Sequence, residues 1–214
     1  MNEGNDVLDK KVELNLWTSI WTKPREAVRY AIDHKSMKFA IILALIAGIF
    51  NMLNGASSNN LGDTMSIPSI FVLGFVLGPI LGWISWWISA GLAKIVGSWL
   101  GGTGRFAELK MALAVSYIPL ILVGVLWIPD LLILGKILFV ESSYISIGQQ
   151  IWLFISGIIS IVVGIWIFVI TIMAISEAHR FSAWRGFWTI VIPSVVVIIV
   201  LLLFLVPFIF FQFL

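Results

Sequence analysis

The sequence lacks cysteine altogether and has few charged residues. Without cysteine the chain can form no disulfide, no thiolate nucleophile and no cysteine-ligated zinc or iron–sulfur site. Only 11% of the 214 residues are charged and 60% are hydrophobic, whereas a soluble domain carries about 25% charged residues. Apolar runs of about 20 residues recur, each long enough to cross roughly 30 Å of hydrocarbon. The composition therefore predicts an all-α, polytopic integral membrane protein.

Charge is also scarce within the apolar segments. Across residues 39–93, 111–176 and 186–214 the charged residues are Asp63, Asp130, Lys136 and Glu141, all of which we expect near the outer surface and none at mid-membrane. A charge at mid-membrane costs about 2.5–3.5 kcal/mol, so one that is kept there usually has a function. This scarcity argues against a proton relay, an ion-coupled carrier and an intramembrane aspartyl protease. The chain has no H-E-x-x-H motif and no evident nucleophile with a base and an orienting acid. We therefore predict no catalytic residue, metal site, cofactor or enzymatic activity.

Five apolar segments define a membrane domain at residues 37–214, which follows a charged arm at residues 1–36. The segments cover 38–55, 69–100, 111–134, 149–176 and 187–211. Basic residues concentrate in the arm and in the loops after the second and fourth segments, and positive loops stay in the cytoplasm. We therefore predict a multi-pass, five-helix bundle in the cytoplasmic membrane, with the N-terminus inside and the C-terminus outside.

One short apolar run, LLILGKILFV at residues 131–140, does not fit a span of its own. It is too short to cross a bilayer and contains Lys136. Either it is an interfacial segment or it extends the third span.

The N-terminal arm has the pattern of two amphipathic helices. Leu16, Trp17, Ile20 and Trp21 form one apolar stripe, and Ala27, Val28, Ala31 and Ile32 form another. Pro24 separates them and suits the first turn of the second helix. Short helices with tryptophans and basic residues usually lie in the membrane interface, which is the interpretation we favour. Docking onto a partner protein is the alternative.

The loop sequence GGTGRF after the second span raises the question of a phosphate cradle at Gly102-Thr103-Gly104. A dinucleotide fingerprint requires a preceding strand and a third glycine, but position 107 is Ala and the flanks are membrane helices. The G-K-[ST] of a P-loop is absent too. The pattern favours a plain turn between two membrane helices.

Small residues recur every four positions in two spans. They are Gly74, Gly78 and Gly82 in span two, and Ser156, Ser160 and Gly164 in span four. Such spacing lets another helix approach closely. We expect packing within the bundle, and a homo-oligomer stays open as the alternative.

The two cytoplasmic loops carry the polar residues that could contact a partner. The candidate contact surface consists of Arg105, Glu108, His179, Arg180 and Arg185. His179 could change charge near neutral pH. The alternative is that these arginines only set the topology.

Four features in this order resemble a known family. They are the five spans, the Pro24-Arg25 step, GGTGRFAELKMALAVSYIP at 101–119 and AHRFSAWRGF at 178–187. Together they are similar to the Yip family (Ypt-interacting protein domain), and specifically to its bacterial branch. The positions that match its pattern are Pro24, Arg25, Gly102, Gly104, Tyr117, Pro119 and His179.

The resemblance implies a five-helix membrane fold without known enzymatic chemistry. Some bacterial relatives act beside ABC-type exporters as accessory subunits. We therefore expect a protein that binds other membrane proteins and membrane lipids but no nucleic acid. It could be an accessory subunit of an ABC-type export or envelope-stress system. The alternative is direct binding or transbilayer movement of a lipid or small amphiphile in an interhelical groove, which the tryptophans of span two suggest.

Overall fold

The computed structural model of the protein describes residues 14–141 and 144–212, without the side chains of 204–212. In the described residues all regular secondary structure is helical. Five helical segments are long and apolar enough to cross a membrane: Met37–Ser58, Ile67–Trp99, Phe106–Ile133, Ile147–His179 and Ala183–Leu203. The predicted all-α fold with five spans is therefore confirmed.

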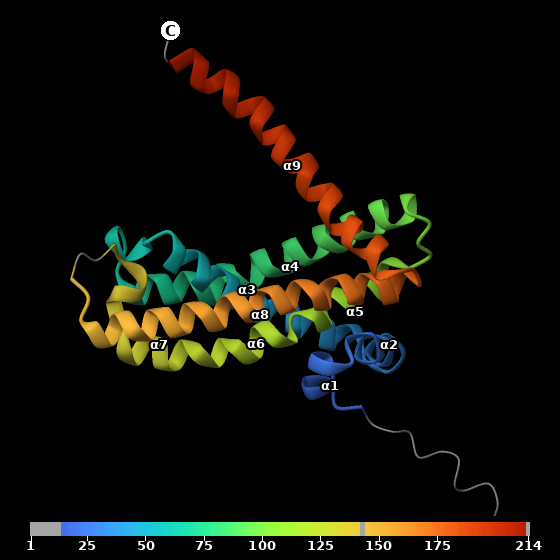
Figure 1. The fold of residues 1–214 in the computed structure, drawn as a ribbon, viewed down its shortest axis with the longest axis horizontal. Helices are drawn as coiled ribbons and strands as arrows, with labels where there is room; N and C mark the ends of the chain where they lie inside the picture. The colour runs from blue at the N-terminus through green and yellow to red at the C-terminus, as the bar shows by residue number, and fades with distance from the viewer. Residues whose placement is uncertain (1–13, 142–143, 213–214) are drawn as a thin grey trace, which may run out of the picture.

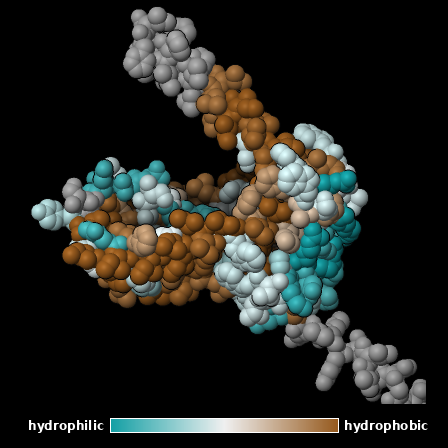
Figure 2. All heavy atoms as spheres, in the orientation of Figure 1, coloured by the Kyte–Doolittle hydropathy of each residue, from teal (hydrophilic) through white to brown (hydrophobic). Residues whose placement is uncertain are grey.

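The spans form an elongated bundle with two different ends (Figure 1). It consists of α3 (Met37–Ser58), α4 (Ile67–Trp99), the broken third span and α8 (Ile147–His179). The last helix, α9 (Ala183–Gln212), starts beside α4 and α8 and then diverges from them. We call the end where α8 finishes the basic end, and the one where α8 begins the opposite end. Figure 2 shows hydrophilic residues gathered at the basic end and a largely hydrophobic surface between the ends.

The arm forms α1 (Leu16–Thr22) and α2 (Pro24–His34), with Pro24 in the first turn as expected. Most of their apolar stripes pack on the protein itself. Leu16 and Ile20 of α1 and Val28 of α2 are buried against the bundle, where α1 contacts α5 and α6 and α2 contacts α5 and α8. Trp17 of the first stripe is 40% exposed, so the position of these helices in the membrane interface stays a prediction.

The third span is broken into pieces. It contains α5 (Phe106–Ser116), α6 (Ile118–Val123), the 3-10 turn η2 (Gly124–Leu126) and α7 (Trp127–Ile133). Pro119 lies in the first turn of α6, where its missing N–H and fixed φ are tolerated but cannot continue the helix before it. Ser116 therefore ends α5, and Tyr117 joins the two pieces as a half-buried residue.

The start of the run 131–140 extends the third span, and the rest of the run forms a separate turn. Residues 131–133 finish α7, so the span extends this far. A 3-10 turn, η3 (Gly135–Phe139), follows and packs beside η1 (Leu61–Asp63). Phe139 is fully buried there, with its ring 5.8 Å from that of Trp127.

Helices α3 and α4 approach each other closely through glycine. A Cβ added at Gly78 would lie 2.8 Å from the Cα of Ile49, and one at Gly82 would lie 2.5 Å from the Cα of Gly48. A Cβ at Gly74 would lie 2.8 Å from the Leu53 side chain. The small-residue stripe of α4 therefore faces its neighbour α3, as helix pairs with this spacing do.

Candidate functional site

His179 is the last residue of α8 and is only 1% exposed. Its Nδ1 accepts a hydrogen bond from the backbone N–H of Gly104 at 3.2 Å, and its Nε2 lies 3.0 Å from the carbonyl oxygen of Ala93. A backbone N–H can only donate, so Nδ1 carries no proton and Nε2 donates to Ala93. The surroundings of the ring therefore select one neutral tautomer of His179, which joins α8 to α4 and to the loop before α5.

Glycines surround this ring because nothing larger fits. A Cβ on Gly97 would collide with Nε2, and one on Gly102 would collide with Nδ1. A Cβ on Gly104 would lie 2.6 Å from the carbonyl oxygen of Ala178. We call Ala93, Gly97, Gly102, Gly104 and His179 the histidine clamp. It gives the GGTG sequence a packing role, and it joins two of the motifs on which the family resemblance rests.

Further backbone contacts hold the clamped loop. The N–H of Thr103 donates to the carbonyl oxygen of His179 at 3.2 Å. The ammonium group of Lys94 donates to the carbonyl oxygen of Gly104 at 2.8 Å. The loop between α4 and α5 is thus fixed from both sides, by α4 and by the end of α8.

Glu108 is a buried carboxylate, 4% exposed, in the first turn of α5. The guanidinium of Arg180 lies 2.8 Å from its Oε1, and the backbone N–H of Arg105 donates to its Oε2 at 2.7 Å. The hydrogen bond to Glu108 raises the pKa of Arg180 above its ordinary value. The ion pair therefore ties the residue after α8 to the start of α5.

Arg180 adopts a backbone conformation that is unusual for its type. It caps α8 in the left-handed region, with φ of 58° and ψ of 42°. This position at helix ends is usually taken by glycine, because a Cβ costs about 1–2 kcal/mol there. The pairing with Glu108 gives a reason for an arginine at this place.

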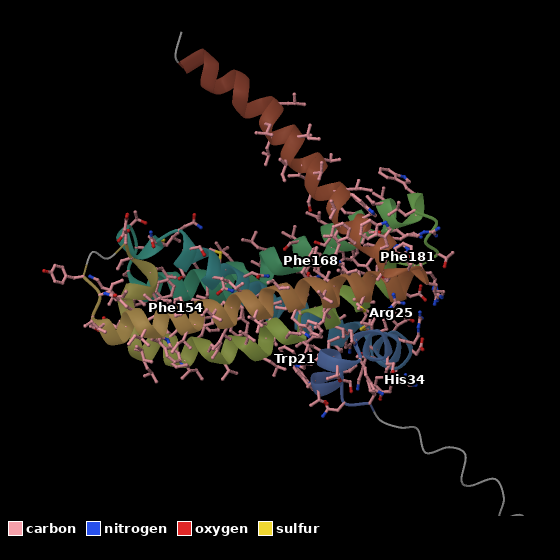
Figure 3. All side chains as sticks on the ribbon, viewed as in Figure 1. Trp21, Arg25, His34, Phe154, Phe168 and Phe181 are labelled. Carbon is pink, nitrogen blue, oxygen red and sulfur yellow. The ribbon has the colours of Figure 1, made fainter. Side chains whose placement is uncertain are left out.

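Glu177, in the last turn of α8, anchors α2. The Arg29 side chain contacts it twice, with Nε 2.9 Å from Oε1 and Nη2 donating to the backbone carbonyl oxygen at 2.8 Å. Arg25, directly after Pro24, lies 3.9 Å from Oε2. Arg25 and Phe181 are labelled at this end of the molecule in Figure 3. The Pro24-Arg25 step therefore serves to place α2 against the end of α8.

The predicted contact surface divides into buried and exposed parts. Glu108 and His179 are buried and hold the loops in place. Arg105 has an 82% exposed side chain, that of Arg180 is 48% exposed, and Arg185 is exposed as well. Arg185 also reaches the α4–α5 loop, with Nη1 3.5 Å from the Cβ position of Gly101. Arg105 lies directly before α5, Arg180 directly after α8, and Arg185 in the first turn of α9. These three arginines form the part of the surface that a partner could touch.

Sequence reasoning counted Arg29 and Lys94 only as positive charges, and it did not foresee their partners. Each pairs across more than one element of the fold, with Glu177 and with the Gly104 carbonyl. Arg29 and Glu177 are 148 residues apart, and Lys94 and Gly104 are ten residues apart across a helix end. No spacing rule connects either pair. Only the repeated occurrence of glycine and histidine near the ends of α4 and α8 could have suggested a close contact.

The tryptophans of α4 have two different environments. Trp86 is 1% exposed, and its Nε1 donates to the carbonyl oxygen of Lys110 at 2.8 Å. Trp83 and Trp87 are each 42% exposed on the outside of the bundle. The ammonium group of Lys110 lies 4.3 Å from the ring centre of Trp87, within cation–π range. The cluster thus combines core packing with an exposed aromatic surface.

A second polar region lies toward the opposite end. A cavity of about 480 Å³ is bordered by α3, α6, α7 and α8; we call it the α8 cavity. Asp130 of α7 lines it and accepts two hydrogen bonds from α8, from Trp152 Nε1 at 2.8 Å and from Ser156 Oγ at 3.0 Å. Across residues 14–141 and 144–212, no group of three His, Asp or Glu residues could hold a metal ion.

The small-residue stripe of α8 borders this cavity. Ser156, Ser160 and Gly164 all line it, and a Cβ added at Gly164 would meet nothing within 4 Å. The close helix packing expected for this stripe is therefore not present in the described structure. The half of α8 that carries it lies beside the broken third span, whose bends leave space.

Comparison with known proteins identifies one family. The Yip1 domain matches residues 18–205, from α1 into α9. No curated protein and no solved structure gives a significant match. The matched range includes the histidine clamp, both loops with the exposed arginines and all five spans, and it covers far more than half of the 214 residues. On this evidence the chain is an integral membrane protein that belongs to the Yip1 domain family.

Proposed function

We propose that this protein is a non-enzymatic subunit that binds another membrane protein through Arg105, Arg180 and Arg185. We call these three residues the arginine surface. The observation that carries the proposal is that three arginines are exposed at the basic end: Arg105 and Arg180 beside loops joined by the histidine clamp, and Arg185 at the start of α9 next to Gly101. A rigid surface loses little conformational entropy when it binds, which favours affinity.

Exposed tryptophans next to these arginines support a binding role. Trp99 is 73% exposed just before the α4–α5 loop, and Trp184 is 65% exposed directly before Arg185. Arginine and tryptophan are the residue types that most often dominate the energy of protein interfaces. Large exposed aromatic side chains beside a fixed charged surface are typical of such a contact.

The proposed setting is the cytoplasmic membrane of a bacterium, with the basic end in the cytoplasm as the positive-inside rule predicts. In this setting the specific form that we propose is an accessory subunit of an ABC-type export or envelope-stress system. Its partner would present acidic or carbonyl groups near the membrane surface, because guanidinium groups bind these best.

The test is the double substitution Arg105→Ala and Arg185→Ala, which keeps the 2.8 Å pair of Arg180 with Glu108 and removes the longer, 3.5 Å contact of Arg105 with the same carboxylate. We expect recovery of a stoichiometric membrane-protein partner from native membranes to fall at least about tenfold, which corresponds to roughly 1.4 kcal/mol of lost affinity. The measurement is quantitative mass spectrometry after purification in a mild detergent.

The matched control is Lys23→Ala with Lys38→Ala, which removes two exposed charges from the same end but outside the arginine surface. It should leave recovery unchanged. Equal recovery of the same partner by the arginine variant and the control would contradict the proposal, provided both variants are expressed and monodisperse.

The α8 cavity favours a second candidate function, the binding of an amphiphile between helices. Its volume of about 480 Å³ is in the range of small-molecule sites, and several of its lining residues are also exposed on the side of the bundle.

A further inference from the structure

Asp130 is the single charged residue among those that line the α8 cavity. Both of its hydrogen bonds come from neutral donors, Trp152 and Ser156, and both are made to Oδ1. Among the residues that the structure describes, no Lys, Arg or His nitrogen lies within 4 Å of its carboxylate oxygens. The chain therefore orients one oxygen of this carboxylate and supplies no countercharge to it.

The position of Asp130 makes a missing countercharge significant. Its donors Trp152 and Ser156 lie about 8–14 Å along α8 from the start of that helix, given a rise of 1.5 Å per residue. Asp130 is half-buried, and the cavity beside it is lined in part by apolar residues such as Leu153 and Leu126. Charged groups in such surroundings are kept with a partner or mark a binding site.

Two hydroxyl groups among the polar residues that line the cavity suit a ligand that donates hydrogen bonds, while Asn54, Ser58 and Ser160 also line it and can both donate and accept. The hydroxyl of Ser57 donates to the carbonyl oxygen of Leu138 at 2.6 Å, so its own oxygen is left to accept. Ser156 uses its proton on Asp130 in the same way. An ammonium group, with three donors and no acceptor, matches these oxygens.

The cavity is open toward lipid along α8. Gly157, Ser160 and Gly164 line the cavity and are at the same time exposed on the outer side of the bundle. No atom would lie within 4 Å of a Cβ on Gly157 or Gly164. A hydrocarbon chain can therefore lie along this face of α8 while its headgroup occupies the cavity.

We propose that the α8 cavity binds an amphiphile with a primary ammonium headgroup and no anionic group, with Asp130 as its counter-ion. The absence of an anionic group follows from the lining, which contains no lysine, arginine or histidine to pair with a phosphate. The inference rests on the second candidate function and is independent of the arginine surface.

The test titrates the purified full-length protein, in a detergent with an uncharged headgroup, with dodecylamine, dodecanol or phosphatidylethanolamine, and counts bound molecules by native mass spectrometry. We expect one dodecylamine per chain, with dodecanol binding at least tenfold more weakly. Asp130→Asn should weaken dodecylamine binding at least tenfold. Asp63→Asn is the matched control, because Asp63 lies in η1 outside the cavity, and it should change nothing.

A second variant tests the cavity without touching the charge. Gly157→Leu fills the open space, which a new side chain can enter without a clash, and we expect it to weaken dodecylamine binding at least tenfold. Gly148→Leu, at an exposed and equally open position outside the cavity, is its control and should bind normally.

Each adverse outcome has a distinct meaning. If dodecanol binds as tightly as dodecylamine, or if Asp130→Asn binds dodecylamine normally, the ammonium site is overturned while amphiphile binding survives. If phosphatidylethanolamine binds as well as dodecylamine, the restriction to ligands without an anionic group is overturned. If none of the three binds to folded protein, the second candidate function fails as well.

Discussion

The small-residue stripes of α4 and α8 share a spacing of four residues but have opposite surroundings. The glycines of α4 face the backbone of α3 so closely that a methyl group would not fit. The stripe of α8 borders a cavity, and a Cβ at Gly164 would touch nothing. Equal spacing therefore permits a close helix contact without determining one. What decides is the neighbour, which is a continuous helix beside α4 and a broken span beside α8.

The same contrast extends to the two ends of the bundle. At the basic end, the histidine clamp and the Glu108–Arg180 pair join α4, α5 and α8 through buried polar contacts. Toward the opposite end, Asp130 also bonds across helices but stands beside about 480 Å³ of open space. One end is therefore built to be rigid, whereas the other has room for a ligand.

The largest expected effect comes from exchanging one glycine in each stripe for leucine. Gly78→Leu places its Cβ 2.8 Å from the backbone of Ile49, which cannot move aside without separating the two helices. We expect a loss of stability of about 3 kcal/mol or more, or failure to fold, since overpacking of this kind costs at least 1–3 kcal/mol. Gly164→Leu should cost less than about 1 kcal/mol, because the space is free.

The measurement is the fraction of monodisperse protein after heating in detergent, followed by size-exclusion chromatography. Similar losses in the two variants would remove the contrast between the stripes. It would mean that another helix, or a second copy of the chain, packs against the small-residue stripe of α8 in the folded protein.

A smaller effect is expected from the histidine clamp. His179→Ala leaves the buried N–H of Gly104 without its partner, whereas the carbonyl of Ala93 keeps the hydrogen bond of its own helix. A buried unpaired group costs about 1–3 kcal/mol, and the packing of the ring is lost as well. We therefore expect a loss of about 2–3 kcal/mol. Gly102→Ala should be destabilising as well, because its methyl group collides with the His179 ring.

The double variant separates the clamp from a general effect of substitution. With the ring removed, a methyl group at position 102 loses its closest contacts but still lies 2.8 Å from the carbonyl oxygen of Gly97, so part of the cost of Gly102→Ala should disappear in the His179→Ala background. Thermal unfolding of the four proteins gives the coupling. Strict additivity would show that the ring and the glycine act independently and would contradict the clamp.

The fold could be predicted from sequence much better than these contacts. Span number and helical class follow from hydrophobicity and length, and both are confirmed by the structure. The break at Tyr117 follows from Pro119, although the five segments predicted from hydrophobicity alone showed a continuous span. Periodicity identified the buried side of the arm helices, but it could not distinguish lipid from protein as the surface that covers it.

The candidate sites depended on long-range neighbours, which a single sequence does not specify. His179 and Arg180 were selected because of their charge and loop position. Burial of His179 follows from three glycines around it, one on α4 and two in the following loop. The role of Asp130 was missed, because its sequence position near the end of a span suggested an ordinary surface charge. Its partners on α8 and the adjacent cavity are products of the tertiary fold.

The smallest expected effect concerns Arg180 at the basic end, whose left-handed backbone conformation is unfavourable for a residue with a Cβ. Arg180→Ala removes the guanidinium from the buried Glu108 carboxylate and keeps a Cβ in the left-handed region. Arg180→Gly removes the same ion pair but also removes that Cβ. Because the two variants lose the same ion pair, they differ only in the conformational preferences of the backbone at position 180.

The left-handed conformation favours glycine by about 1–2 kcal/mol, and the greater freedom of glycine in the unfolded chain offsets about 0.4–1 kcal/mol of that. We therefore expect Arg180→Gly to be more stable than Arg180→Ala by up to about 1.6 kcal/mol, measured by thermal unfolding in the same detergent. A glycine variant less stable than the alanine variant would show that residue 180 leaves the left-handed conformation once Glu108 no longer holds it.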